Sequence, residues 1–191
     1  MGAEIAELLV QTVREPRIAA RRILDMRLAP STIWMGFALV VVLSAFFGWI
    51  TLSLVPEEAR PVMMADVSPV RLAFAQGGSM LVLAAFVTAG GRIFGGKATF
   101  LGALVLAVWL EFLLVCLQVL QLVLVLVLPI LSVLVGYATI VILLRVLTGF
   151  VAEVHGFTSQ WKVFGGIVVG FLVAGLLILA IVGPQMPIGD V

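Results

Sequence analysis

The sequence is poor in charge and in the residues that usually carry chemistry. Only 11% of its 191 residues are charged, it has one cysteine (Cys116) and one histidine (His155), and asparagine is absent. A single cysteine excludes an intramolecular disulfide and a cysteine-rich metal site. Soluble domains carry about 25% charged residues. A chain with so few charges cannot cover a water-soluble surface.

Apolar residues dominate instead. They make up 63% of the chain, and the mean hydropathy is +1.31. This content is too high for a disordered chain. The formal net charge of +1 excludes nucleic acid as a partner, because such binding needs many basic groups to neutralise phosphates. The composition therefore predicts an all-α integral membrane protein whose first partner is the lipid bilayer.

The first 30 residues are predicted to form a cytosolic, amphipathic and basic helical segment. They hold no long apolar run, so we expect no cleaved secretory signal. Residues 3–14 have the spacing of an amphipathic helix, and Pro16 suits the first turn of a second one. The arginines of this segment are Arg14, Arg17, Arg21, Arg22 and Arg27. They either only anchor the topology of the first span or dock on an anionic leaflet or a partner.

Five membrane spans are predicted from runs of about 20 apolar residues. The 47 residues from Ala98 to Leu144 contain one charge, and a single helix of that length would measure about 70 Å. The chain must therefore reverse there, and Pro129 places the reversal near 122–131. The predicted spans are 31–55, 70–91, 98–121, 131–152 and 161–182, within a membrane domain of 31–183 that is followed by a short outer tail, 184–191.

Basic residues predict the orientation of these spans. With the N-terminus inside, the inner segments carry eight basic residues, and the outer loops carry two, Arg60 and Arg71. The positive-inside rule then predicts a cytoplasmic N-terminus and a C-terminus outside. A composition rich in Arg, Ala, Val, Leu and Gly suits a GC-rich bacterial genome, so the bacterial inner membrane is the expected location.

Motifs of enzymes are missing, and we expect no catalytic, cofactor-binding or metal-binding residues. There is no His-Glu-x-x-His helix, no Gly-x-Ser-x-Gly elbow and no phosphate-binding Gly-Lys-Ser/Thr loop. Glu153 and His155 are the one possible general-base pair. Two residues apart at the end of a span, they are more typical of a solvated connection. The sequence predicts a protein that is not an enzyme.

Two ionisable residues are predicted deep in the bilayer, Glu111 and Arg145. An unpaired charge at the bilayer centre costs at least about 2.5–3.5 kcal/mol. Consecutive antiparallel spans bring the two to reachable depths, which favours a structural ion pair. The alternatives are Arg145 snorkelling inward beside a protonated Glu111, or an ion or proton path continued by Gln118. On the last span, small residues predict close helix packing: Gly166, Gly170 and Ala174.

Three segments resemble the Yip family of Ypt/Rab-interacting, five-span membrane proteins, in its bacterial form. They are Glu7 to Leu24, the pair Gly136-Tyr137, and the run from Glu153 to Lys162. The resemblance implies a cytosolic N-terminus followed by five spans. Eukaryotic members carry Asp-Leu-Tyr-Gly-Pro before the first span, where this chain reads Arg27-Leu-Ala-Pro.

The function expected from all this is that of a non-enzymatic scaffold, assembly helper or accessory subunit that binds other membrane proteins or a second copy. The alternative is a small transporter or channel subunit that uses Glu111, Arg145 and Gln118. One segment bears on the first interpretation, because Leu122–Leu128 contains only Leu and Val. Such a turn is either covered by a partner or absent because the helices run longer in lipid.

Overall fold

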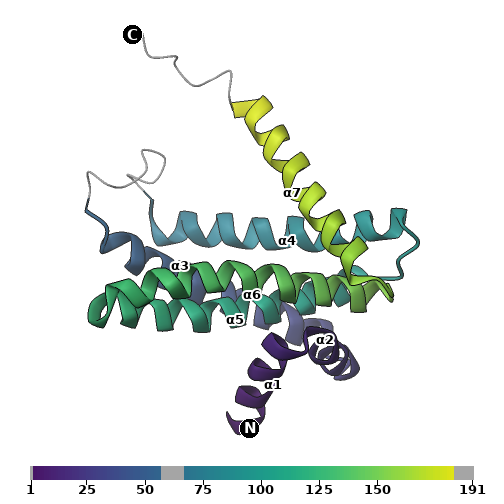
Figure 1. Cartoon of the computed structure of the whole chain (residues 1–191), viewed down its shortest axis with the longest axis horizontal. Coiled ribbons are helices and arrows are strands. Elements are labelled where there is room, and N and C mark those ends of the chain that lie inside the picture. Colours follow the sequence, from purple (N-terminus) through teal and green to yellow (C-terminus); the bar gives the residue numbers. More distant parts are fainter. Residues whose placement is uncertain (1, 57–66, 183–191) are drawn as a thin grey trace.

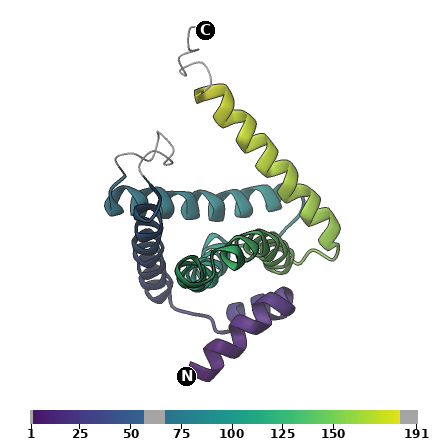
Figure 2. The same cartoon turned by 60° about the vertical axis from the view of Figure 1, so that its left-hand side comes forward.

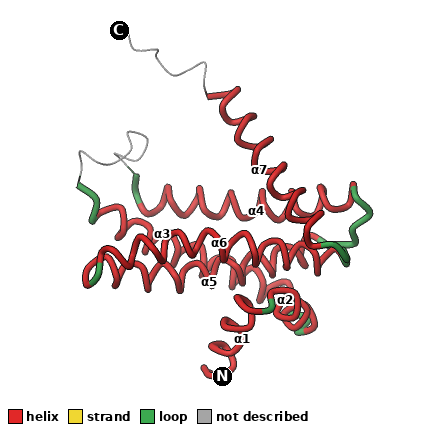
Figure 3. The backbone as a smooth tube through the Cα atoms, viewed as in Figure 1, coloured by secondary structure: helices red, strands yellow, loops and turns green. Residues whose placement is uncertain are grey.

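The structure, a computed structural model, describes residues 2–56 and 67–182, and in them every regular element is a helix (Figure 1). Apart from the connection between α3 and α4, most of which lies outside the described residues, the helices are joined by short connections (Figure 3). Most of the predicted outer loop and the whole predicted tail lie outside the described residues. The helices are α1 (Gly2–Arg14), α2 (Pro16–Asp25), α3 (Pro30–Ser53), α4 (Pro69–Ile93), α5 (Phe100–Val127), α6 (Pro129–His155) and α7 (Gln160–Val182).

Four of these helices, α3 to α6, are long and apolar enough to cross a membrane. Pro30, Pro69 and Pro129 each occupy the first turn of a long helix. A helix has no intrahelical partner for its first N–H groups, so the missing N–H of proline costs no hydrogen bond there. The all-helical membrane fold expected from the composition is thus present.

Helices α5 and α6 form a tight antiparallel hairpin. Helix α5 continues to Val127 and α6 begins at Pro129, so Leu128 alone separates them. The Leu128 N–H donates to the Leu124 carbonyl at 2.7 Å, which closes the last turn of α5. Most of the apolar segment 122–128 is therefore helix, and of the two explanations for it the structure supports longer helices.

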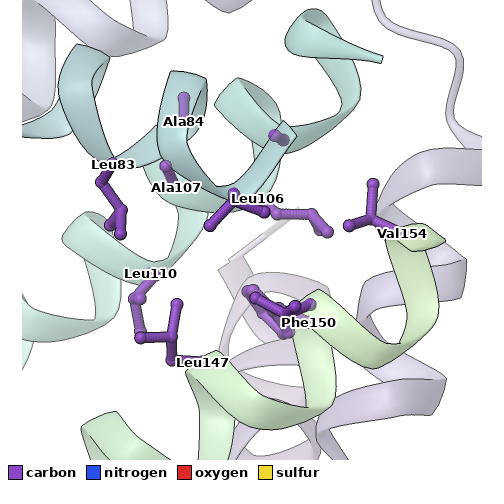
Figure 4. Close-up of a pocket in the computed structure, with 11 residues that line it drawn as sticks. Leu83, Ala84, Leu106, Ala107, Leu110, Leu147, Phe150 and Val154 are labelled. Atoms are coloured by element: carbon purple, nitrogen blue, oxygen red, sulfur yellow. The ribbon is translucent and has the colours of Figure 1, made fainter. Parts of the chain in front are cut away.

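Helix α5 lies at the centre of the bundle, where it packs against α2, α3, α4 and α6. Leu104 of α5 and Val146 of α6 are fully covered. A void of about 20 Å³ remains between α4, α5 and α6, and its lining is apolar, with Leu106, Leu110 and Phe150 among the side chains (Figure 4). A void without polar partners does not hold ordered water. No side chain that lines it can transfer a proton or bind a metal ion.

Helices α1 and α2 pack on the α5–α6 hairpin, on the side away from α4 (Figures 1 and 2). Ala19, Ala20 and Ile23 of α2 are buried there. Pro16 meets α6 at Gly149, where a Cβ would lie 2.7 Å from the Cβ of the proline. A larger residue than glycine at position 149 would push α2 away. The N-terminal segment is therefore packed onto the bundle along one apolar face.

Helix α7 packs against α6 near its start and then diverges from the other helices (Figures 1 and 2). Its described apolar part, Gln160–Leu176, is shorter than the four candidate spans, so the fifth span stays a prediction. The small residues of α7 have different surroundings. A Cβ at Gly170 would lie 3.1 Å from the Phe86 ring of α4, whereas Gly166 has open space around it, and Ala174 is exposed.

Candidate functional site

The carboxyl group of Glu111 lies in a polar cluster between three long helices. The polar side chains that interact with it are those of Ser44 of α3 and Gln76 of α4, and only 7% of the residue is exposed. A buried carboxyl group without polar neighbours would be costly, and these two side chains give it a polar environment. The cluster ties α3, α4 and α5 together inside the apolar bundle.

Arg145 has a different partner. Its Nη2 donates to the backbone carbonyl of Arg14, the last residue of α1, at 2.7 Å. Glu111 and Arg145 are both 17 residues from Leu128 along the chain, so they lie at similar depths, but they face opposite sides of the hairpin. The structure replaces the predicted Glu111–Arg145 pair with two separate contacts. Similar depth alone does not bring two residues into contact, because the partner of each residue depends on the direction in which its side chain points.

The glutamines after Glu111 also point in different directions. A Cβ at Gly48 of α3 would lie 3.6 Å from Nε2 of Gln118. Gln121 faces α6, where its Nε2 donates to the Ser132 carbonyl at 3.4 Å. The two glutamines of α5 therefore face two different neighbouring helices.

A cluster of charges joins α2 to the C-terminal end of α6. Arg17 Nε and Arg21 Nε donate to the two carboxylate oxygens of Glu153, at 3.1 and 2.8 Å. The Glu153 side chain is 10% exposed. Its hydrogen bond and negative charge raise the pKa of Arg21. One carboxylate thus holds two successive turns of α2 against the bundle, and we name this group the Glu153 clamp.

The remaining N-terminal arginines are exposed. Arg22 forms an exposed ion pair with Glu7 of α1, at 3.3 Å. Arg27 follows α2 with a left-handed backbone conformation, φ 45°. Three of the five predicted docking arginines, Arg17, Arg21 and Arg22, thus have carboxylate partners within the chain. Docking on a membrane or partner stays a prediction for the set as a whole.

His155 lies at the end of the bundle where α4 ends and α5 begins. It is 2% exposed, its Nε2 lies 2.9 Å from the Val87 carbonyl, and its Nδ1 accepts from the Ala98 N–H at 3.4 Å. These contacts fit the neutral imidazole with its proton on Nε2. A Cβ at Gly91 or Gly96 would lie 2.2 or 2.1 Å from imidazole atoms. The ring fills a space that two glycines leave open, and we name this arrangement the His155 lock.

These contacts give Glu153 and His155 separate structural roles. The carboxylate faces α2, and the imidazole faces α4 and the α4–α5 connection. A general base needs a free lone pair within reach of a reacting group, and both imidazole nitrogens are engaged. Among the residues that the structure describes, there is also no group of three or more metal-ligating side chains.

Sequence reasoning missed one buried polar contact between α1 and α5. Thr12 is fully buried, its hydroxyl donates to the Leu8 carbonyl at 2.7 Å, and it accepts from the Trp109 indole N–H at 2.8 Å. No local pattern marks this threonine. Ser44 and Gln76 carried a usable signal, because polar side chains inside apolar spans seek one another.

Similarity to known proteins extends over most of the chain. The family model described as the Yip1 domain matches residues 10–182, a range that contains α2 to α7 and most of the described residues. No curated protein and no solved structure matches the chain.

Proposed function

The chain belongs to the Yip1 domain family, and from this membership and the geometry above we propose that it is a non-enzymatic scaffold or accessory subunit in a membrane. It binds other membrane proteins through its apolar helices. Its partners are recognised by packing within the bilayer, where small and apolar surfaces set how closely helices approach.

The observation that carries this proposal is that Glu111, Glu153 and His155 each contact other groups of the same chain. Glu111 interacts with Ser44 and Gln76, Glu153 is bound by two arginines, and His155 by backbone groups of α4 and of residue 98. A reaction or an ion path needs polar groups that face a substrate or a water-filled route. Here they connect helices, which supports a rigid binding protein.

Helix α7 offers an exposed apolar surface for a partner. It diverges from the bundle (Figure 2), and large apolar side chains are exposed around it: Val169, Phe171, Leu172, Val173, Leu176 and Leu179. Lipid covers such a surface as readily as protein does. Because α7 has few neighbours in its own chain, much of its surface is open to a helix of another chain. Gly166 lies beside open space and permits that helix to approach closely.

The proposed topology has five spans, with the N-terminus in the cytoplasm and the C-terminus outside, in the inner membrane of a bacterium. Helix α7 has 23 residues, or about 35 Å at 1.5 Å per residue, which exceeds the ~30 Å hydrocarbon thickness. The excess of basic residues on the N-terminal side supports the orientation. The family form proposed for this chain is the bacterial one.

Crosslinking within native membranes tests the scaffold role. A photo-reactive amino acid at Leu172, exposed on α7, is expected to give one discrete adduct with a membrane protein. The same probe at Leu104, which is fully buried, is the matched control and should give none. The partner is then purified and recombined with the chain, and a stable complex of fixed stoichiometry is expected.

Two results would contradict the proposal. One is equal crosslinking from Leu172 and Leu104, which would mean that the adduct does not depend on the exposed face. The other is solute flux by the purified chain alone in vesicles, abolished by Glu111→Gln, which would favour a transporter.

A further inference from the structure

An open cavity of about 250 Å³ lies where the corner between α1 and α2 meets α6 and the start of α7. The charged residues that line it are Arg14, Glu15, Arg17 and Arg145, three positive and one negative, which gives a net charge of +2. Including Arg21 and Glu153 from the Glu153 clamp adds one charge of each sign and leaves the balance at +2. The cavity therefore favours an anion.

The guanidinium groups in this cavity keep donors for a ligand. Arg145 uses Nη2 on the Arg14 backbone carbonyl, and a guanidinium has five N–H donors in all. Because that contact involves the backbone of Arg14, it leaves the Arg14 side chain uninvolved. Planar guanidinium groups bind phosphate oxygens in pairs. Two of them at one cavity suit a phosphate group.

The cavity lies at the level of the inner headgroups. Arg145 follows Leu128 by 17 residues, or about 25 Å along α6, and the hydrocarbon is ~30 Å thick. With the apolar hairpin end at the outer boundary, Arg145 comes within about 5 Å of the inner boundary. Gln160, which also lines the cavity, precedes Trp161, which is 84% exposed. Tryptophan prefers this interface.

An exposed apolar stripe on α6 leads from the cavity toward the outer side. Its members recur every three or four residues before Arg145, so they share one helix face, and each is more than half exposed: Ile130, Leu134, Tyr137 and Val141. From Ile130 to Arg145 the stripe is about 22 Å long, which is more than the ~15 Å of one leaflet. A phosphate in the cavity can therefore carry an acyl chain along this stripe.

We propose that the cavity is a binding site for the phosphate headgroup of an anionic phospholipid of the inner leaflet, with an acyl chain lying along the α6 stripe. A lipid satisfies both parts of the surface at once, the cationic cavity and the apolar stripe that continues from it. A soluble phosphate would use only the first part. The site holds α1, α2, α6 and the start of α7 around one ligand, and it does not depend on a protein partner.

The test titrates the purified full chain with phosphatidylglycerol and counts bound lipid by native mass spectrometry. Phosphatidylcholine with the same acyl chains is the zwitterionic reference. Arg14→Gln removes a guanidinium from the cavity but keeps the backbone carbonyl that holds Arg145. Arg22→Gln is the matched control, because it removes the same charge from a site that faces Glu7 instead.

Phosphatidylglycerol is expected to bind at least about tenfold more tightly than phosphatidylcholine, and Arg14→Gln to weaken it about tenfold. Arg22→Gln should stay within about twofold, as an exposed ion pair contributes little. Arg145→Lys, which keeps a donor for the Arg14 carbonyl but loses the planar fork, is a second variant that should bind more weakly. Thermal unfolding without lipid confirms that the variants are folded.

Equal losses in Arg14→Gln and Arg22→Gln would mean that overall charge decides the binding, and the site would be refuted. Glycerol phosphate, the headgroup without acyl chains, separates the two sources of phosphate. Much weaker binding of glycerol phosphate supports the lipid. Binding as tight as that of the lipid, with the same dependence on Arg14, would make a soluble phosphate the ligand and overturn the lipid assignment.

Discussion

Two adjacent glycines of α4 should respond in opposite ways to the same substitution. Gly91 faces the His155 lock, where an added Cβ would lie 2.2 Å from Cε1 and from Nε2 of the imidazole, whereas Gly90 has no neighbouring atom within 4 Å of such a Cβ. Both lie in the same helix. Gly90→Ala is therefore a matched control for Gly91→Ala, because the change in helix propensity is common to both.

The expected magnitudes follow from the contacts of His155. Inserting a methyl group into a filled space costs about 1–3 kcal/mol. Moving the ring away from the Val87 carbonyl, now at 2.9 Å, leaves a buried group unsatisfied and costs about 1–3 kcal/mol more. Replacing glycine by alanine in a helix stabilises the helix by about 1 kcal/mol. Gly91→Ala should thus lower the free energy of unfolding by about 1–5 kcal/mol, and Gly90→Ala should leave it unchanged or raise it by up to about 1 kcal/mol.

The assay is unfolding of the purified chain in mixed micelles with increasing denaturing detergent. A His155→Ala background completes the experiment, since the small side chain removes the clash. In that background Gly91→Ala should cost little or become stabilising, so the two effects are strongly non-additive. Equal stability of the Gly90 and Gly91 variants, or additive effects of the Gly91 and His155 changes, would refute the lock.

Three further predictions concern the charged groups and the topology. Glu153→Gln should lower the free energy of unfolding by about 1–3 kcal/mol and speed tryptic cleavage within α2. Arg22→Gln, at an exposed ion pair, should change the free energy of unfolding by less than about 1 kcal/mol. Equal effects of the two changes would contradict the Glu153 clamp. Glu111→Gln and Arg145→Gln should have additive effects on thermal stability, because each residue has its own partners. A large coupling energy between the two changes would mean that the residues interact directly. Reporter fusions at Arg60 and at the C-terminus should both report the outer side; a cytoplasmic C-terminus would leave an even number of spans.

The positions of the long helices could be predicted well from the sequence. Apolar runs of sufficient length and prolines at helix starts are local signals, and Pro30, Pro69 and Pro129 begin their helices in the structure. The length of 98–144 required a reversal, and it occurs at Leu128. The reversal is tighter than predicted because the Leu and Val residues before it extend α5 and leave no polar turn.

The partners of the polar groups could not be predicted in the same way. Helices that are apolar all around carry no amphipathic signal of which face lies inward, so the directions in which Glu111 and Arg145 point could not be predicted. The His155 lock depends on Val87 and Gly91, 68 and 64 positions earlier in the chain. Such long-range contacts have no trace in a single sequence. The resemblance to the Yip family did not depend on these long-range contacts. The family-model match over residues 10–182 confirms that resemblance.

The packing of the N-terminal helices on α6 sets an order of assembly during synthesis. Arg17 and Arg21 precede Glu153 by 136 and 132 residues, and at about 5–20 residues per second a ribosome needs roughly 7–27 s to cover that distance. For this time the face of α2 that carries Ala19 and Ile23 has no α6 to cover it. The surface of the bilayer is the nearest apolar phase, so we expect the nascent segment to lie there until α6 is made.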